Sequence, residues 1–117
     1  MLFVNYPKCS TCRKAKNWLD EHGIEYESRH IIDDNPSSEE LREWWGMSDL
    51  PLKRFFNTSG MKYRELKLKD KLPDMSEDEQ LDLLATDGML VKRPILVGDD
   101  DVVLVGFKIK EWEEKLL

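Results

Sequence analysis

The fold of this chain is decided by the stretch Tyr6-Pro7-Lys8-Cys9-Ser10-Thr11-Cys12-Arg13-Lys14. A short apolar run, Leu2-Phe3-Val4, precedes it, as expected of a buried strand. The segment that follows has a helical pattern, because residues of one face recur at spacings of three and four: Ala15, Trp18, Leu19 and His22. Gly23 stands where a helix usually ends. The order predicts a strand, a tight proline turn, a Cys-x-x-Cys motif and a helix.

Cys9 falls at the start of this predicted helix. Unpaired backbone N–H groups point outward there, and the helix dipole favours negative charge. Three basic residues stand close by in sequence: Lys8, Arg13 and Lys14. Such surroundings lower the pKa of a cysteine from about 8.5 to roughly 3.5–7.5, and the thiolate is the reactive form. Cys9 is therefore the predicted nucleophile.

Cys12 lies close enough in sequence for its sulfur to reach that of Cys9 and close a small disulfide ring. It can thereby release whatever Cys9 has captured, which is the geometry of thiol–disulfide exchange. Three other interpretations compete with this one. A zinc site lacks a second cysteine pair, and the only histidines are His22 and His30. A stabilising disulfide would constrain little chain, and the basic flanks argue against inert buried cysteines.

Composition limits the class of protein. The 117 residues suffice for one domain with a real core, and 40% hydrophobic content suits a soluble globular chain. The formal charge of −6 argues against direct nucleic-acid binding. No apolar run is long enough to span a membrane, and no signal-peptide pattern follows Met1. With only two cysteines, spaced as a redox pair, we expect a cytoplasmic protein.

Beyond Gly23, residues 24–32 alternate between apolar and polar and predict a second strand, parallel to the first. Residues 33–36 break it, and Ser37 with Glu40 forms a capping box for a helix that ends at Gly46. Trp44 and Trp45 on this helix are expected in the core, although they could also form a binding surface.

The middle of the chain is predicted to be helical throughout. Brief helical turns are expected around Leu52 to Phe56, in residues 63–68 and in residues 69–72. A second capping box, Ser76 with Glu79, begins a helix that we expect to stop at Gly88. A helical insertion of about residues 35–88 results.

Two apolar runs, residues 93–97 and 102–105, flank a Gly/Asp turn at residues 98–101 and predict an antiparallel hairpin. A last helix follows, with one apolar side: Ile109, Trp112 and Leu116. The predicted fold is therefore α/β and thioredoxin-like, with a mixed four-stranded sheet, helices on both faces and a helical insertion in a single domain, residues 1–117.

Arg93-Pro94 opens the third strand, where this fold commonly has a cis proline beside the Cys-x-x-Cys turn. A cis X–Pro bond costs only about 0.5–1 kcal/mol. Arg93 would then face the sulfur and bind an anion or stabilise the thiolate. The other reading makes Arg93 a surface cation and Pro94 an ordinary strand start. The sequence leaves both readings open.

Four segments together resemble the arsenate reductase (ArsC) family, including its Spx-like and uncharacterised reductase-like branches: Cys9-Ser10-Thr11-Cys12-Arg13-Lys14, Phe56-Asn57-Thr58-Ser59-Gly60, Tyr63-Arg64 and Arg93-Pro94-Ile95. The resemblance covers essentially the whole chain. It implies a thioredoxin-like fold with a helical insertion. It also implies that Cys9 is the nucleophile and that Arg93 contacts a bound oxyanion.

The chain departs from the glutaredoxin-coupled reductases of that family in two ways. Those enzymes carry a single cysteine in the loop, whereas this chain has Cys12 as well. They also hold the oxyanion with two further arginines, at the places where Asn57 and Gly106 stand here. Arg64 or Arg54 is a candidate to take over the oxyanion contacts of those two arginines.

By this resemblance we expect a thiol oxidoreductase that acts on arsenate or another substrate, an oxyanion or a disulfide. The anion would be held by Arg93, by Arg64 and by the turn around Ser10, Thr11 and Arg13. Glutathione with glutaredoxin, or thioredoxin, would restore the thiols, and no metal or tightly bound cofactor is called for. We expect a monomer.

Two other functions stay open. A redox-sensing regulator of Spx type would bind RNA polymerase through the C-terminal domain of its α subunit, with Cys9 and Cys12 as the switch. A structural or binding domain with incidental cysteines is the third reading.

Overall fold

The computed structural model describes residues 1–99 and 101–117. Its elements follow the order β1 (Leu2–Asn5), α1 (Ser10–Glu21), β2 (Glu27–His30), α2 (Ser38–Ser48), η1 (Leu52–Phe55), α3 (Met61–Glu65), α4 (Leu68–Lys71), η2 (Leu72–Asp74), α5 (Glu77–Leu84), η3 (Gly88–Leu90), β3 (Ile95–Val97), β4 (Val103–Val105) and α6 (Ile109–Leu116). None of the described helices is long and apolar enough to cross a membrane.

The four strands form one mixed sheet in the order β2-β1-β3-β4. β1 runs parallel to β2 and antiparallel to β3, and β3 pairs antiparallel with β4. In this register Phe3 lies between Ser28 and Leu96. The predicted β-α-β unit, the hairpin and the thioredoxin-like sheet are confirmed. The turn predicted at residues 98–101 includes Asp100, which lies outside the described residues.

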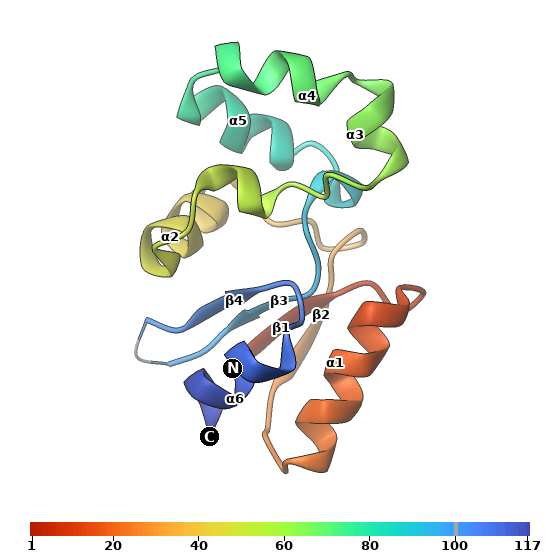
Figure 1. The fold of residues 1–117 in the computed structure, drawn as a ribbon, viewed down its shortest axis with the longest axis vertical. Helices are drawn as coiled ribbons and strands as arrows, with labels where there is room; N and C mark the ends of the chain where they lie inside the picture. The colour runs from red at the N-terminus through yellow and green to blue at the C-terminus, as the bar shows by residue number, and fades with distance from the viewer. Residues whose placement is uncertain (100) are drawn as a thin grey trace.

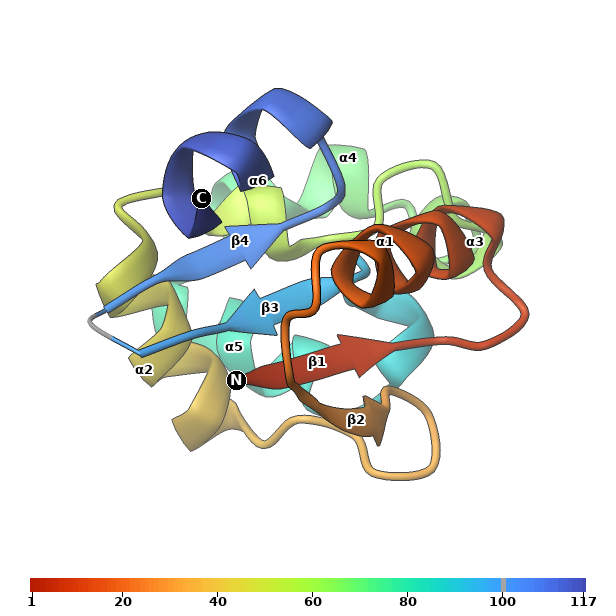
Figure 2. The ribbon, with the colours of Figure 1, turned by 90° about the horizontal axis from the view of Figure 1, so that it is seen from below.

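Each face of the sheet is covered by its own helices. α1 and α6 cover one face, and the insertion with α2 to α5 covers the other (Figures 1 and 2). Alternate residues of β1 divide between the two faces, because successive strand side chains point to opposite sides. Phe3 packs with Ala15, Trp18 and Trp112 under α1 and α6, whereas Val4 belongs to the larger cluster toward the insertion.

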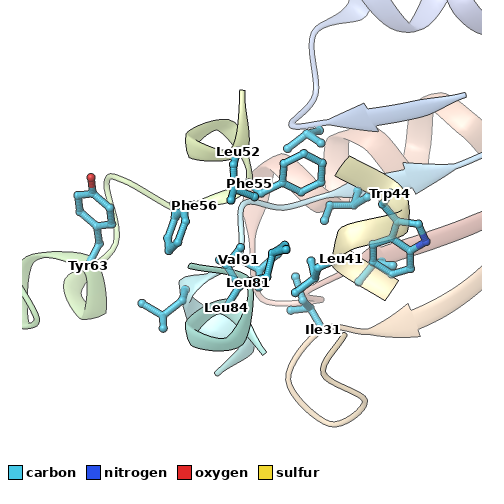
Figure 3. Packing of buried hydrophobic residues seen from close by; sticks show 14 of the residues in the cluster. Ile31, Leu41, Trp44, Leu52, Phe55, Phe56, Tyr63, Leu81, Leu84 and Val91 are labelled. Atoms are coloured by element: carbon cyan, nitrogen blue, oxygen red, sulfur yellow. The ribbon is translucent and has the colours of Figure 1, made fainter. Parts of the chain in front are cut away.

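The insertion is held to the sheet by this larger cluster, whose members Leu41, Phe55 and Leu84 are completely buried. Figure 3 shows such side chains from α2, α5 and the segment around Phe55 pointing toward one another. Both capping boxes are present, at Ser37 and at Ser76.

A partly buried ion pair also links the insertion to the sheet. Arg29 of β2 donates to both carboxylate oxygens of Glu40, at 2.6 and 2.9 Å, and its guanidinium lies 5.9 Å from the centroid of the Trp44 ring. Glu40 is also the N3 residue of the α2 capping box and accepts from Ser37 N–H, so one carboxylate links the helix start to the strand.

Several predicted boundaries were wrong. The second strand is only Glu27–His30, because residues 31–34 turn back, with Asp34 N–H donating to the His30 carbonyl at 2.9 Å. α2 continues through Gly46 to Ser48, and Asp49 ends it with a φ of 57°. α5 ends at Leu84, since Gly88 begins a separate 3-10 turn packed against Ile31.

Two further expectations need correction. The break between the two brief middle helices lies at Lys67, whose φ is 53°, so Leu68 belongs to the second helix. Ile109, predicted on the apolar side of the last helix, is 52% exposed because it starts α6 at the surface. Trp44 is buried as expected, and Trp45 is half-buried, with its indole N–H donating to the Leu50 carbonyl at 2.8 Å.

Candidate functional site

Cys9 is the N-cap residue of α1, so its side chain stands at the first turn of the helix. The turn before it is closed by Cys9 N–H, which donates to the Tyr6 carbonyl at 2.9 Å. The Cys9 carbonyl accepts from Arg13 N–H at 3.1 Å and begins the helical ladder. The prolyl turn and the helix therefore fix the sulfur where unpaired N–H groups converge.

These surroundings favour the thiolate of Cys9. Burial is the largest influence and opposes ionisation, but hydrogen bonds from Cys12, Arg93 and Thr11 outweigh it and lower the pKa of Cys9 below its ordinary value. The Cys12 contribution comes from both its backbone N–H and its side chain. Cys9 therefore ionises more readily than a free cysteine.

Cys12 is held in the opposite state. Its side chain is almost completely buried, and its sulfur accepts from Tyr6 N–H at 3.5 Å. Burial and the neighbouring negative charge of Cys9 raise the pKa of Cys12 to about 12. Both residues are free cysteines. One sulfur is therefore poised as an anion, while its neighbour keeps its proton.

Arg93 lies beside Cys9, two residues before β3, and its peptide bond to Pro94 is cis. Its guanidinium lies 5.3 Å from the centroid of the Tyr6 ring. Within the described part of the chain, Nε and Nη1 of Arg93 are buried without a hydrogen-bond partner. Buried unpaired donors are costly, so this guanidinium is suited to receive an anionic ligand.

Cys9 opens into a cleft of about 890 Å³ between α1, α3 and the start of α6. We call it the cationic cleft, because its lining includes five basic residues and one carboxylate, Glu65. The basic residues are Arg54, Lys62, Lys92, Arg93 and Lys108. This positive surface contrasts with the chain's net charge of −6.

The sequence that forms this site matches a known family: the model of the ArsC family matches residues 4–115. The chain belongs to the ArsC family. Among curated ArsC relatives, an uncharacterised protein of Bacillus subtilis, YusI, is 61% identical over 97% of this chain and 96% of its own length. The regulatory protein MgsR of the same organism is 33% identical, over 89% of this chain and 81% of its own length. The global transcriptional regulator Spx of Listeria monocytogenes is 30% identical, over 90% and 78%.

Solved structures extend the likeness to the fold. A protein of Bacteroides fragilis described as related to the ArsC family superimposes with a TM-score of 0.93 at 61% identity, over 97% of this chain and 94% of that one. An arsenate reductase of Vibrio cholerae superimposes with a TM-score of 0.83 at 27% identity, over 100% and 98%. The ArsC family therefore includes both reductases and regulators similar to this chain.

Not all of the residues predicted for anion binding meet in the cationic cleft of this ArsC chain. Cys9, Thr11 and Arg93 line it, whereas Ser10, Arg13 and Arg64 are exposed side chains outside its lining. The Arg64 guanidinium instead donates to the Ser59 carbonyl at 3.3 Å. Of the two arginines considered as replacements, Arg54 is the one at the cleft.

Sequence reasoning missed Lys62, Lys92 and Lys108. Nothing in their local patterns distinguishes them from ordinary surface lysines, since only the packing of three separate segments brings them to one cleft. The one available signal was that Lys92 adjoins Arg93. In the described residues, no group of three or more His, Cys, Asp and Glu side chains is placed to hold a metal ion.

Proposed function

We propose that the protein is a thiol-dependent oxidoreductase in which Cys9 is the nucleophile and Cys12 the resolving thiol. The observation that carries the proposal is the contrast between the two sulfurs. The pKa of Cys9 is lowered where it opens into the cationic cleft, while burial and Cys9 itself raise the pKa of Cys12 to about 12. An anionic nucleophile beside a protonated partner is the arrangement that two-step thiol chemistry requires.

In the first step the Cys9 thiolate attacks the substrate, either an oxyanion such as arsenate or a disulfide. With arsenate, a sulfur–arsenic bond forms and one oxygen leaves as water after protonation. Arg93 and the N–H groups of the first turn of α1 neutralise the anion during this attack.

In the second step Cys12 attacks the Cys9 sulfur and closes a disulfide. The sulfur–arsenic bond breaks, its electron pair remains on arsenic as arsenite, and the Cys12 proton passes to solvent. Formation of the adduct removes the negative charge of Cys9, which is one cause of the raised pKa of Cys12. Cys12 therefore becomes easier to ionise when its attack is needed. Glutathione with glutaredoxin, or thioredoxin, then restores both thiols.

The test compares wild type with Cys9→Ser and Cys12→Ser in reduction of arsenate and of a model disulfide, with both electron-donor systems supplied. We expect turnover in wild type, none in Cys9→Ser, and a covalent Cys9 adduct in Cys12→Ser that mass spectrometry detects. Equal inactivity of wild type and Cys9→Ser toward every substrate would overturn the proposal.

A redox-sensing regulator is the second candidate, favoured by the likeness to MgsR and Spx. In that role the disulfide between Cys9 and Cys12 would change binding to the α subunit of RNA polymerase. A pull-down with purified α subunit, with the protein reduced or oxidised, tests it. Absence of binding in both states would exclude this role.

A further inference from the structure

The cationic cleft is larger than a tetrahedral oxyanion needs. Its volume of about 890 Å³ lies in the range of roughly 300–1,000 Å³ that small organic ligands occupy. Its positive charge also extends beyond Arg93, the cation beside the sulfur. A single small anion at Cys9 would leave most of this charged lining without a partner.

Lys92 lies beside the position where the resemblance to the arsenate reductases implies an arginine in those enzymes. Gly106 stands at that position, and a Cβ added to it would lie 3.5 Å from Cε of Lys92. Gly106 also has a φ of 78°, which disfavours any side chain there. The aliphatic stem of Lys92 therefore lies over the bare glycine and carries its ammonium group along the cleft.

Arg54 and Lys92 are positioned by the same short stretch of paired backbone. Lys92 N–H donates to the Phe55 carbonyl at 2.8 Å, and Asn57 N–H donates to the Leu90 carbonyl at 2.8 Å, on either side of an isolated bridge between Phe56 and Val91. We call this pairing of residues 55–57 with 90–92 the insertion ladder. It fixes the backbone next to both cations.

Little in the protein neutralises these charges. Lys62 lies 3.8 Å from an oxygen of Asp87, and Glu65 also lines the cleft. In the described ranges, no ion pair within 4.0 Å involves Arg54, Lys92, Arg93 or Lys108. Four cations therefore line the cleft without an ion pair in the described residues, and Glu65 is the carboxylate found in that lining.

We propose that the substrate is a small organic disulfide that carries two or more carboxylates, and that Lys92 and Arg54 select it. This inference rests on the proposed thiol chemistry of Cys9. The disulfide sulfur meets Cys9, while the carboxylates pair with Lys92 and Arg54 along the cleft.

The chemistry is a balanced exchange. The Cys9 thiolate forms a bond to one sulfur of the substrate, whose disulfide bond breaks and whose other half leaves as a thiolate. Cys12 then attacks Cys9, the mixed disulfide breaks, and the second half leaves as a thiol with the Cys12 proton. The substrate gains two electrons and the cysteine pair loses them, so an external thiol must reduce the pair again.

The test measures how fast the reduced protein reacts with three small disulfides of different charge. These are 3,3′-dithiodipropionate (anionic), bis(2-hydroxyethyl) disulfide (neutral) and cystamine (cationic). We expect the anionic disulfide to react about 10-fold faster than the neutral one, and cystamine to be the slowest. In about 1 M salt, where the Debye length is about 3 Å, the preference should largely vanish.

Substitutions test which residues cause the preference for the anionic disulfide. Lys92→Gln and Arg54→Gln should each lower the anionic-to-neutral rate ratio about threefold or more, and Lys92→Arg should restore it. Lys71→Gln is the matched control, since it removes the same charge from an exposed residue of α4 outside the cleft and should keep the wild-type ratio.

Failure of the ligand proposal can be distinguished from failure of the proposed function. Equal reactivity with all three disulfides, or a fall in the ratio as large in Lys71→Gln as in Lys92→Gln, would overturn the proposal and leave Cys9 as the nucleophile. No reaction with any disulfide, and none with arsenate, would instead remove the proposed function itself.

Discussion

The guanidinium of Arg93 lies 5.3 Å from the centroid of the Tyr6 ring, and the backbone N–H of Tyr6 donates to the sulfur of Cys12 at 3.5 Å. Tyr6 therefore contacts both the cation beside Cys9 and the second sulfur. Since it ends the β1 side of the turn, it couples the position of Arg93 to that of the cysteine pair. The ring is worth about 0.5–2 kcal/mol to the cation, depending on solvent exposure.

Removing Arg93 should make Cys9 a weaker acid. Arg93 is one of the groups that lower the pKa of Cys9, so Arg93→Gln should raise that pKa and slow alkylation near pH 7. The measurement is the pH dependence of iodoacetamide labelling at Cys9, resolved by mass spectrometry. Tyr6→Leu should shift the profile in the same direction by a smaller amount. An unchanged profile in Arg93→Gln would remove its electrostatic role.

The two cysteines should differ sharply in reactivity. Because the pKa of Cys12 is raised to about 12 and its side chain is buried, the folded, reduced protein should show one rapidly labelled thiol near pH 8. The second should react only after unfolding in denaturant. A thiol titration under both conditions checks this, and two equally fast thiols in the folded state would contradict it.

Gly88 should tolerate no side chain. A Cβ at this position would lie 2.1 Å from the Ile31 carbonyl oxygen, so Gly88→Ala forces the backbone apart and should cost at least about 2 kcal/mol of unfolding free energy. Gly46→Ala is the control, since its Cβ would meet nothing within 4 Å and the residue is helical. It should stabilise the protein by about 0.5–1 kcal/mol. Urea denaturation of both variants measures the difference, and equal effects would contradict the packing.

The pair between Arg29 and Glu40 should make stability depend on acidity. Hydrogen bonds from Arg29 lower the pKa of Glu40 from 4.5 to about 2. This contribution is fully present above the unfolded pKa and is lost as the pH falls from about 5 toward 2. At neutral pH, Glu40→Gln should cost about 1–2 kcal/mol, less than the full pKa difference, because solvent screens a partly exposed carboxylate.

The measurement is the unfolding free energy of wild type and Glu40→Gln at several pH values. Their difference should shrink steadily below about pH 5. Gln retains the shape of the side chain and can still accept a hydrogen bond, so a difference that persists unchanged to pH 2 would assign the effect to packing.

Much of the fold was predictable because its signals are local. The capping boxes at Ser37 and Ser76 predicted two helix starts correctly, since a side chain reaching its own backbone needs no distant partner. Helix ends were predicted less well. Gly46 lies inside α2, and Asp49 takes the left-handed conformation that ends the helix, a role that sequence patterns assign to glycine first.

The site was predictable only where it depends on the turn around Cys9. The placement of Cys9 and the cis bond before Pro94 match the expectations from sequence. Lys92 and Lys108 could not be identified, because the cleft is formed by residues that are distant in sequence and meet only in the folded chain. Arg64 shows the converse, since a motif match placed it in the site but its side chain lies outside the cleft lining.

The insertion ladder positions two cleft cations on a part of the chain distinct from the cysteine turn. The cysteine turn belongs to the β1–α1 unit, whereas Arg54 directly precedes the ladder and Lys92 is part of it. Grafting residues 35–92 onto the scaffold of a relative should therefore transfer the preference for anionic ligands. The recipient should keep the reactivity of its own cysteines. If the graft behaves in this way, ligand preference and sulfur chemistry are set by different segments of the chain.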